Sequence, residues 1–332
     1  MATSYYSGKN NIMIKLMIKL KILTIICSLC VVPTEKCSGS IGYIANSTIN
    51  IGDEIQALAV KRFLKQDAVA IDREFVHEFR YNKKIKTIIN GWFMQHKSGY
   101  WDLLRPPPDK SWPPSPAIDP FFISIHFTGT FLSTVFSDEH IEYLKKHAPI
   151  GARDFFTLHE LQKRNIPSYF SGCLTLTLEN NYKERNDIIY LVDLDDRCVN
   201  YIKSKVTSPV VVVTHGRSMF PFLNHEQRLQ YAEYILDLYR KAKCVVTTRL
   251  HAAMPCLAFQ TPVLMLTTVR KGSPIDARFT GLTEHVKSCS REELCHGDID
   301  YDFDNPPENP TTYLPLRENL IKIMTTWVQE NS

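Results

Sequence analysis

The sequence lacks the short motifs that mark several large enzyme classes. It has no glycine-lysine loop for nucleoside triphosphates, no dinucleotide glycine fingerprint, and no Ser, His and Asp in a triad order. Apart from Cys27 and Cys30 in the apolar N-terminal run, no pair among its nine cysteines has zinc-ligand spacing. The formal net charge of +4 is too small for the dense basic face of a nucleic-acid-binding protein. We therefore expect no metal, no cofactor and no nucleic-acid partner.

An apolar run near the N-terminus, Ile22 to Val32, is too short to span a bilayer, which takes about 20 residues. Lys15, Lys19 and Lys21 precede this run, and small residues follow it at Cys37-Ser38-Gly39-Ser40. This order is typical of a secretory signal. It favours a cleaved signal over a short membrane anchor, with a first core element as the third interpretation. We expect a secreted protein or one in the ER or Golgi lumen, touching membrane only through residues 1–40 if these stay uncleaved.

Two further features bear on a secretory route. Asn46-Ser47-Thr48 is a glycosylation acceptor sequence for a chain that enters that pathway. Cys27 and Cys30 would leave with a signal peptide, and an odd number of cysteines would remain. Cys289 and Cys295 lie close together in a loop-like stretch, and we predict that these two form a bridge.

The composition, with 44% hydrophobic and 22% charged residues, indicates a globular protein whose length suits two domains. The second half alternates between apolar runs and segments with helical spacing, which predicts a parallel sheet with crossover helices. The run 209–213 shows no alternation, so we predict a strand buried on both faces. The predicted strands are 187–192, 209–213, 244–247 and 262–266, and the predicted helices are 195–204, 226–243 and 251–259.

The first half shows the same pattern less regularly. It predicts strands at 41–45, 86–89 and 121–125, helices at 53–64 and 137–147, and a proline-rich loop at 105–116. A boundary near Ala148-Pro149 gives four parts. These are a signal or anchor at 1–40, a first Rossmann-like domain at 41–148, a second at 149–300, and a linker with a last helix at 301–332.

The segment Thr247 to His251 joins a buried strand directly to a helix. Such a turn lies at the carboxyl end of a parallel sheet, where open α/β folds bind ligands. The helix start attracts anions, and Arg249 adds a planar fork for phosphate or carboxylate. His251 adds a group that carries a proton near neutral pH. The alternative is that Arg249 pairs with a neighbouring carboxylate and His251 has no chemical role.

Four other turns are candidates for the same edge. Arg153, after Pro149-Ile150-Gly151-Ala152, could hold a phosphate or form an exposed ion pair with Asp154. Gly52 permits close backbone approach before a helix, and Asp53 is a possible cap of that helix. The remaining candidate cleft residues are Asn90, Trp92 and His215, which follow or end predicted strands.

The order of these turns resembles that of the polysaccharide pyruvyl transferase family, over about Gly52 to Pro262. One turn departs from the pattern, because Ser171-Gly172-Cys173 stands where many members have Asp-Pro. The resemblance rests on Gly52-Asp53-Glu54-Ile55-Gln56, Asn90-Gly91-Trp92, Ile150-Gly151-Ala152-Arg153-Asp154, Ser171-Gly172-Cys173-Leu174-Thr175-Leu176 and Arg249-Leu250-His251-Ala252.

The resemblance implies two Rossmann-like domains facing across a cleft, as in the GT-B glycosyltransferases. It implies phosphoenolpyruvate as donor and a pyruvate ketal formed on two hydroxyls of a sugar in a glycan. The donor would contact Arg153, Arg249, Leu250 and His251, and we hypothesise that His251 is the general acid or base. Two alternatives are a GT-B glycosyltransferase with a nucleotide-sugar donor and a glycan-binding relative without catalysis.

Overall fold

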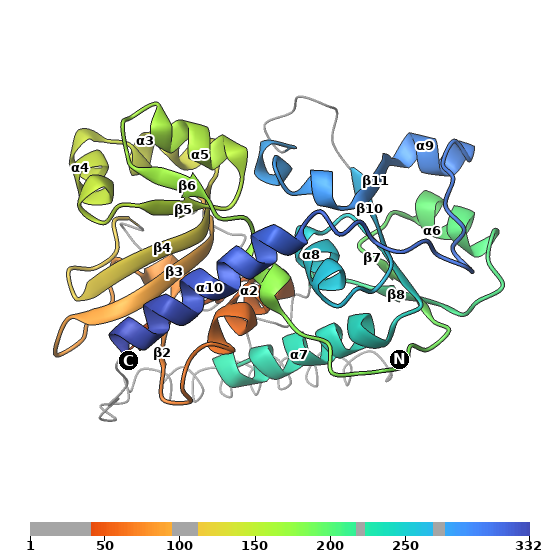
Figure 1. Cartoon of the computed structure of the whole chain (residues 1–332), viewed down its shortest axis with the longest axis horizontal. Helices are drawn as coiled ribbons and strands as arrows, with labels where there is room; N and C mark the ends of the chain where they lie inside the picture. Colours follow the sequence, from red (N-terminus) through yellow and green to blue (C-terminus); the bar gives the residue numbers. More distant parts are fainter. Residues whose placement is uncertain (1–40, 95–111, 217–222, 268–275) are drawn as a thin grey trace, which may run out of the picture. The chain divides into compact units, whose positions relative to one another are not determined.

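The computed structural model describes residues 41–94, 112–216, 223–267 and 276–332. These residues form two sheets in which every neighbouring pair of strands is parallel. The first sheet has the order β2-β1-β3-β4-β5-β6, and the second has the order β11-β10-β9-β7-β8 (Figure 1). The predicted α/β class with parallel sheets is confirmed. The predicted signal segment at 1–40 lies outside the described residues, as does 105–111 of the proline-rich loop.

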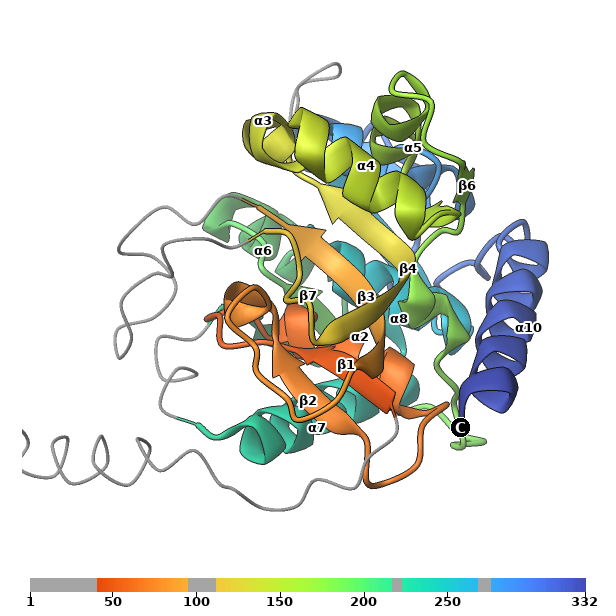
Figure 2. The ribbon, with the colours of Figure 1, turned by 90° about the vertical axis from the view of Figure 1, so that its left-hand side faces the viewer.

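The first sheet contains every strand that the sequence predicted for that half and adds three short ones. Figure 2 shows β1 to β4 side by side. Its strands are β1 (Ile41–Ala45), β2 (Val69–Asp72), β3 (Ile85–Phe93), β4 (Ile118–Phe127), β5 (Ile150–Ala152) and β6 (Ser168–Phe170). Its helices are α2 (Ile51–Lys61), α3 (Leu132–Val135), α4 (Asp138–Lys146) and α5 (Phe155–Gln162).

The second sheet also follows the predicted alternation. Its strands are β7 (Ile189–Val192), β8 (Val210–Val213), β9 (Cys244–Thr247), β10 (Val263–Thr267) and β11 (Lys287–Ser290). The helices of this half are α6 (Asp196–Lys203), α7 (His225–Lys241), α8 (Leu250–Ala258), α9 (Arg291–His296) and α10 (Leu314–Asn331). Among the described residues, no helix is both long and apolar enough to cross a bilayer.

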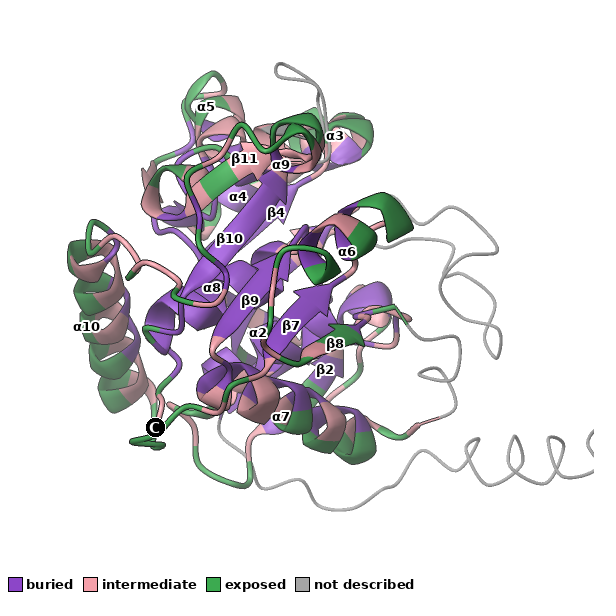
Figure 3. Ribbon diagram, turned by 90° about the vertical axis from the view of Figure 1, so that its right-hand side faces the viewer, coloured by how far each residue is buried: buried purple, intermediate pink, exposed green. Residues whose placement is uncertain are grey.

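The predicted burial of β8 on both faces is wrong. β8 is the edge strand of its sheet, and Val211 and Val212 are 39% and 52% exposed (Figure 3). A run of valines without alternation fits a central strand, but the pattern of one strand does not encode which strands pair with it. β7 and β9, which lie inside the sheet, are buried throughout.

The change from one sheet to the other lies after the predicted boundary at Ala148-Pro149. β5 pairs with β4, and β6 pairs with β5, so both strands extend the first sheet. The second sheet starts only with β7 at Ile189. β5 and β6 have three residues each, too few for a periodic signal. The division into separate domains stays a prediction.

Two contacts join the elements of one sheet to those of the other. α2 packs against α7, where Arg228 of α7 donates from Nε to Glu54 of α2 at 2.7 Å in a buried ion pair. α10 returns to the first sheet, because Trp327 stacks on Phe121 of β4 with ring centroids 4.9 Å apart. The predicted linker that starts at residue 301 contains no strand or helix before α10 begins at Leu314.

The expected disulfide and the expected glycosylation site both need correction. The predicted Cys289–Cys295 bridge is absent, because both thiols are free in the described structure. Cys295 of α9 instead has its Sγ 3.7 Å from the Sγ of Cys198 on α6. Asn46 is 7% exposed and donates its amide to the carbonyl of Asp53 at 3.0 Å, so the folded chain does not present it for glycosylation.

We expect oxidation of the folded protein by glutathione disulfide to join Cys198 to Cys295, since their sulfurs already lie 3.7 Å apart and need only a small movement to reach bonding distance. Peptide mapping without reduction would detect the link. Cys295→Ser should abolish it, whereas Cys244→Ser should leave it intact, because Cys244 is fully buried against Tyr301. A dominant Cys289–Cys295 peptide would contradict the expectation.

Candidate functional site

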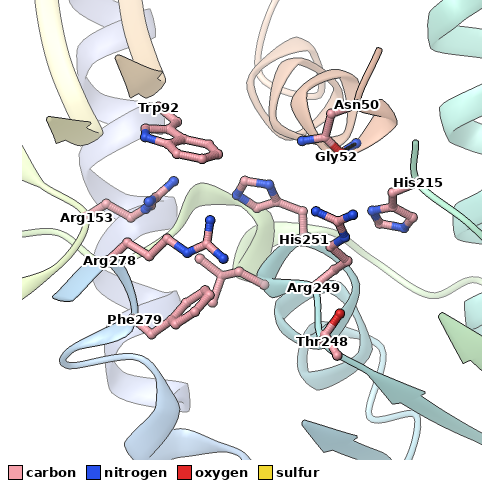
Figure 4. A pocket seen from close by; sticks show the side chains of 11 residues that line it. Asn50, Gly52, Trp92, Arg153, His215, Thr248, Arg249, His251, Arg278 and Phe279 are labelled. Atoms are coloured by element: carbon pink, nitrogen blue, oxygen red, sulfur yellow. Dashed lines mark hydrogen bonds between the residues drawn. The ribbon is translucent and has the colours of Figure 1, made fainter. Parts of the chain in front are cut away.

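One pocket gathers most of the predicted site residues, and we call it the strand-end pocket (Figure 4). Its members come mainly from the carboxyl ends of strands β3, β5, β8 and β9, the edge where parallel sheets bind ligands. No carboxylate is among its described lining residues. These are Asn50, Gly52, Trp92, Arg153, His215, Thr248, Arg249, Leu250, His251, Arg278 and Phe279.

Arg153 brings a buried positive charge to the pocket. It follows β5 directly, and its side chain is 2% exposed. Its Nε has no hydrogen-bond partner among the described residues, and the Oδ2 of Asp154 lies 3.6 Å away. The predicted alternative of an exposed ion pair is wrong, because the side chain of Asp154 is 0% exposed. Removing a guanidinium from water costs on the order of several kcal/mol unless charged partners compensate its charge.

Asp154 is shared among several groups behind the pocket. Its Oδ1 accepts the N–H of Thr157 at 2.9 Å and caps α5. Its Oδ2 lies 2.6 Å from Nδ1 of the buried His126. The carboxylate is therefore committed to these neighbours as well as to Arg153, and it compensates the Arg153 charge only in part.

His251 lies in the middle of the pocket, between Arg153 and Arg278 on one side and Arg249 on the other (Figure 4). It is 8% exposed, and its Nε2 has no hydrogen-bond partner among the described residues. Burial lowers the pKa of His251 well below its usual range, and the positive charges of Arg153 and Arg278 lower it further. The ring is therefore neutral at pH 7 in the ligand-free protein.

Gly52 allows the first turn of α2 to approach the His251 ring. A Cβ on Gly52 would lie 3.3 Å from both Cβ and Nδ1 of His251. The cap of α2 is Asn50, whose side chain accepts the N–H of Gly52 at 3.1 Å, rather than Asp53. The positive end of the α2 dipole thus lies beside His251 and also opposes its protonation.

Arg249 pairs with the carboxylate of Asp193, a residue that the sequence patterns did not indicate as part of the site. Its Nε donates to Oδ2 of Asp193 at 2.7 Å, so the predicted alternative of carboxylate pairing holds for this residue. The Arg249 side chain nevertheless stays 42% exposed and lines the pocket. Burial opposes ionisation of Asp193, but a hydrogen bond from Thr214 and the Arg249 charge outweigh it and lower the pKa of Asp193.

Arg278 adds a third guanidinium from the segment after β10. Its Cζ lies 5.3 Å from the ring centroid of Trp92, the distance of a cation–π contact. Trp92 itself is fixed by a hydrogen bond from its Nε1 to Thr128. Trp92 and Arg278 thus form the wall of the pocket next to Arg153 (Figure 4).

His215 lines the pocket from the end of β8. Its Nε2 lies 2.7 Å from the hydroxyl of Tyr239, and its carbonyl accepts the N–H of Ile51 at 2.8 Å. Burial lowers the pKa of His215 to about 4, and the nearby Asp193 only partly offsets this effect. His215 is therefore a neutral group that joins the end of β8 to the start of α2.

Two predicted cleft residues and one turn lie away from the pocket lining. Asp53 forms a buried ion pair with Arg73 at 3.3 Å, and Asn90 donates its amide to the carbonyl of Gln56 at 3.3 Å. In the turn that departs from the family pattern, Ser171 Oγ accepts the N–H of Ser124 at 3.0 Å and so joins β4 to the chain after β6. These residues stabilise the scaffold behind the site.

Asp193 and Arg278 are site residues that the sequence patterns did not indicate. Asp193 directly follows β7, so the rule that sites form at strand ends could have selected it. Arg278 lies in a short 3-10 helix, Asp276–Phe279, and no motif surrounds it.

The model of the polysaccharide pyruvyl transferase family matches residues 50–268 of the chain. The chain belongs to the polysaccharide pyruvyl transferase family. The match covers every described lining residue of the strand-end pocket except Arg278 and Phe279. The family is one of transferases that act on polysaccharides, as the sequence resemblance indicated.

Other comparisons add little to the family match. No curated protein matches the chain. A functionally uncharacterized protein from Klebsiella pneumoniae subsp. pneumoniae has a TM-score of 0.45 at 12% identity, covering 81% of this chain and 97% of that one. MnaA of S. aureus in a co-structure with UDP has a TM-score of 0.40 at 10% identity, covering 88% of this chain and 97% of that one. Likenesses this weak say nothing further about this pyruvyl transferase family member.

We expect Arg153→Gln to raise the pKa of His251. The substitution removes a positive charge that disfavours the protonated ring, so the pKa moves back toward its usual value. A ¹⁵N NMR titration of the histidine rings, with the His251 signal assigned by its loss in His251→Gln, measures the shift. Arg164→Gln is the matched control, because Arg164 pairs with Glu160 and is not a pocket residue. A His251 pKa that is unchanged in Arg153→Gln would show that this charge does not act on the ring.

Proposed function

We propose that the protein transfers the enolpyruvyl-derived group of phosphoenolpyruvate to two hydroxyls of one sugar in a glycan, forming a pyruvate ketal and releasing phosphate. The observation that carries the proposal is the arrangement of Arg153, Arg249 and Arg278 around Nε2 of His251, an atom without a hydrogen-bond partner in the described part of the chain. Membership of the polysaccharide pyruvyl transferase family supports it. The donor is the only small anion required, and no cofactor takes part.

The charge of the pocket suits this donor. Phosphoenolpyruvate carries a phosphate and a carboxylate, and guanidinium groups bind both through paired hydrogen bonds. Arg153 has a buried Nε without a hydrogen-bond partner among the described residues, so an anion gains more from it than from an exposed arginine. The start of α8 at Leu250 and His251 adds the positive end of a helix.

The reaction needs two proton movements. One hydroxyl proton of the sugar ends on the methylene carbon of the donor, which becomes a methyl group, and the other leaves with the phosphate. The two sugar oxygens bond to the central carbon of the donor, and the bond from that carbon to the phosphate oxygen breaks. Neutral His251 is suited to accept a hydroxyl proton first. The negative charge of a bound donor then raises its pKa, so the same ring can return the proton to the methylene carbon.

The acceptor sugar would enter beside Trp92 and Asn50. Trp92 is only partly buried and presents an indole to the pocket, a surface on which the apolar face of a sugar can stack. Both residues belong to the part of the chain that forms the first sheet, as does Arg153 after β5, whereas Arg249 and His251 follow β9 of the second. The donor would therefore contact residues from both sheets. We propose the GT-B-like arrangement, in which acceptor and donor sides face each other across a cleft. We also propose a location in the secretory pathway, on the basis of the signal-like order of residues in the N-terminal segment.

We expect phosphoenolpyruvate to raise the melting temperature of the protein and uridine diphosphate to leave it unchanged. The three arginines of the pocket match a small trianion, and binding to the native state alone stabilises it. A thermal shift experiment measures the difference. Stabilisation by uridine diphosphate alone would favour the nucleotide-sugar glycosyltransferase instead. Phosphate release with phosphoenolpyruvate and a panel of sugars then separates the transferase from a glycan-binding relative, which would bind without turnover.

We expect His251→Gln to lower phosphate release by about 10²–10⁴-fold, the usual contribution of one acid–base group. The matched control is His285→Gln, because His285 contacts Thr312 and is not a pocket residue. A loss below about tenfold would rule out the proton-transfer role.

The same role gives a pH dependence. His251 has a lowered pKa and must be neutral to accept a proton, so kcat/KM should be constant above pH 6.5 and fall at lower pH. This acidic limb should be missing in His251→Gln. A limb that persists unchanged in this variant would assign the titration to another group.

A further inference from the structure

Asp193 occupies the first position after β7 in an uncommon backbone conformation. Its φ is +54°, in the left-handed region that residues other than glycine rarely adopt. Such a conformation costs about 1–3 kcal/mol and persists only where surrounding contacts impose it. Asp193 makes such contacts, since its N–H donates to the carbonyl of Val213 at 3.0 Å and its carbonyl accepts the hydroxyl of Thr248 at 3.0 Å.

The Asp193 carboxylate joins the ends of three neighbouring strands. Its Oδ2 accepts Nε of Arg249 at 2.7 Å, and the same oxygen accepts the backbone N–H of His215 at 3.1 Å. Arg249 follows β9 and His215 follows β8, while Asp193 itself follows β7. One carboxylate therefore sets the positions of two residues that line the strand-end pocket.

Arg249 needs such a partner more than Arg153 does. Packing surrounds the Arg153 side chain, which is 2% exposed, whereas the Arg249 side chain is 42% exposed. A long exposed side chain loses conformational entropy when a ligand fixes it. The ion pair uses Nε of Arg249, which leaves the two Nη groups of the guanidinium for a paired contact with a phosphate or carboxylate.

We propose that Asp193 is a positioning residue that fixes Arg249 in the orientation that binds the anionic donor, with no contact of its own to the donor. The assignment of the donor as phosphoenolpyruvate rests on the proposed function, but the coupling of Asp193 to Arg249 does not. Asp193→Ala removes the carboxylate, so Arg249 becomes free to move. Asp193→Asn keeps an oxygen that can accept from Nε of Arg249 and so preserves its orientation.

A double-mutant cycle on phosphoenolpyruvate affinity tests the proposal. By calorimetry, Asp193→Ala should raise the Kd about tenfold, and Asp193→Asn should raise it less than about threefold. In the Arg249→Ala background, Asp193→Ala should change the Kd by less than about twofold, because the residue on which it acts is gone. Equal effects in both backgrounds would overturn the proposal.

The matched control is Asp195→Ala, two residues along the chain. Asp195 caps α6 and pairs with Arg291 at 3.0 Å, but it is not among the pocket residues. This variant should lose stability and keep the wild-type Kd, which separates a general effect of a lost carboxylate from the positioning of Arg249.

A second readout needs no donor. Hydrogen exchange at Nε–H of Arg249, assigned in NMR spectra by its loss in Arg249→Lys, should be at least about tenfold slower in the wild type than in Asp193→Ala. If the wild type fails to bind phosphoenolpyruvate but shows this difference, the proposed donor is wrong and the positioning role stands. If exchange at Arg249 is equally fast in both proteins, the positioning role is wrong whatever the donor.

Discussion

The site depends on the positive charge of Arg153, whose side chain is 2% exposed and lines the same pocket as the neutral ring of His251. Its neighbour Asp154 also caps α5 and binds His126, so it cannot fully compensate the guanidinium. The part of the charge that Asp154 does not compensate favours an anion in the pocket. Burial of His251 lowers the pKa of its ring, and the Arg153 charge lowers it further. The Arg153 charge thus favours anion binding and adds to the effect of burial that keeps His251 neutral at pH 7.

The scaffold maintains this arrangement through contacts between the elements of the two sheets. The Arg228–Glu54 ion pair joins α7 to α2, and the carbonyl of His215 accepts the N–H of Ile51 at the start of α2. The absence of a side chain at Gly52 then lets α2 approach His251 closely. Gly52, which the sequence places near the start of a helix, therefore also lies against His251, the candidate acid–base group.

The sequence predicted those features that depend on local pattern. Apolar runs and helical spacing located the central strands, and the strand-to-helix turns placed Arg153 and His251 at one edge. Features that depend on long-range pairing were not predictable. The valines of β8 do not reveal an edge position, and closeness in sequence suggested Cys289 as the partner of Cys295, although Cys198 lies nearer in space.

Asp193 shows the same limit within the site. Its contact with Arg249 joins residues 56 positions apart. The strand end before Asp193 could have marked it as a candidate, but nothing in the sequence identifies it as the partner of Arg249. Motifs identify groups that contact a ligand, whereas the groups that orient them appear only once the strand ends are assembled.

The most direct test of the account follows the donor carbon through the reaction. The protein is incubated in D₂O with [2-¹³C]phosphoenolpyruvate and a sugar that supports phosphate release, and the product is examined by ¹³C NMR. The proposed transfer should give a labelled ketal carbon bonded to a methyl group that carries one deuterium, because the methylene carbon gains one proton from an exchangeable group. Labelled free pyruvate without any ketal, or unchanged phosphoenolpyruvate across the sugar panel, would contradict it.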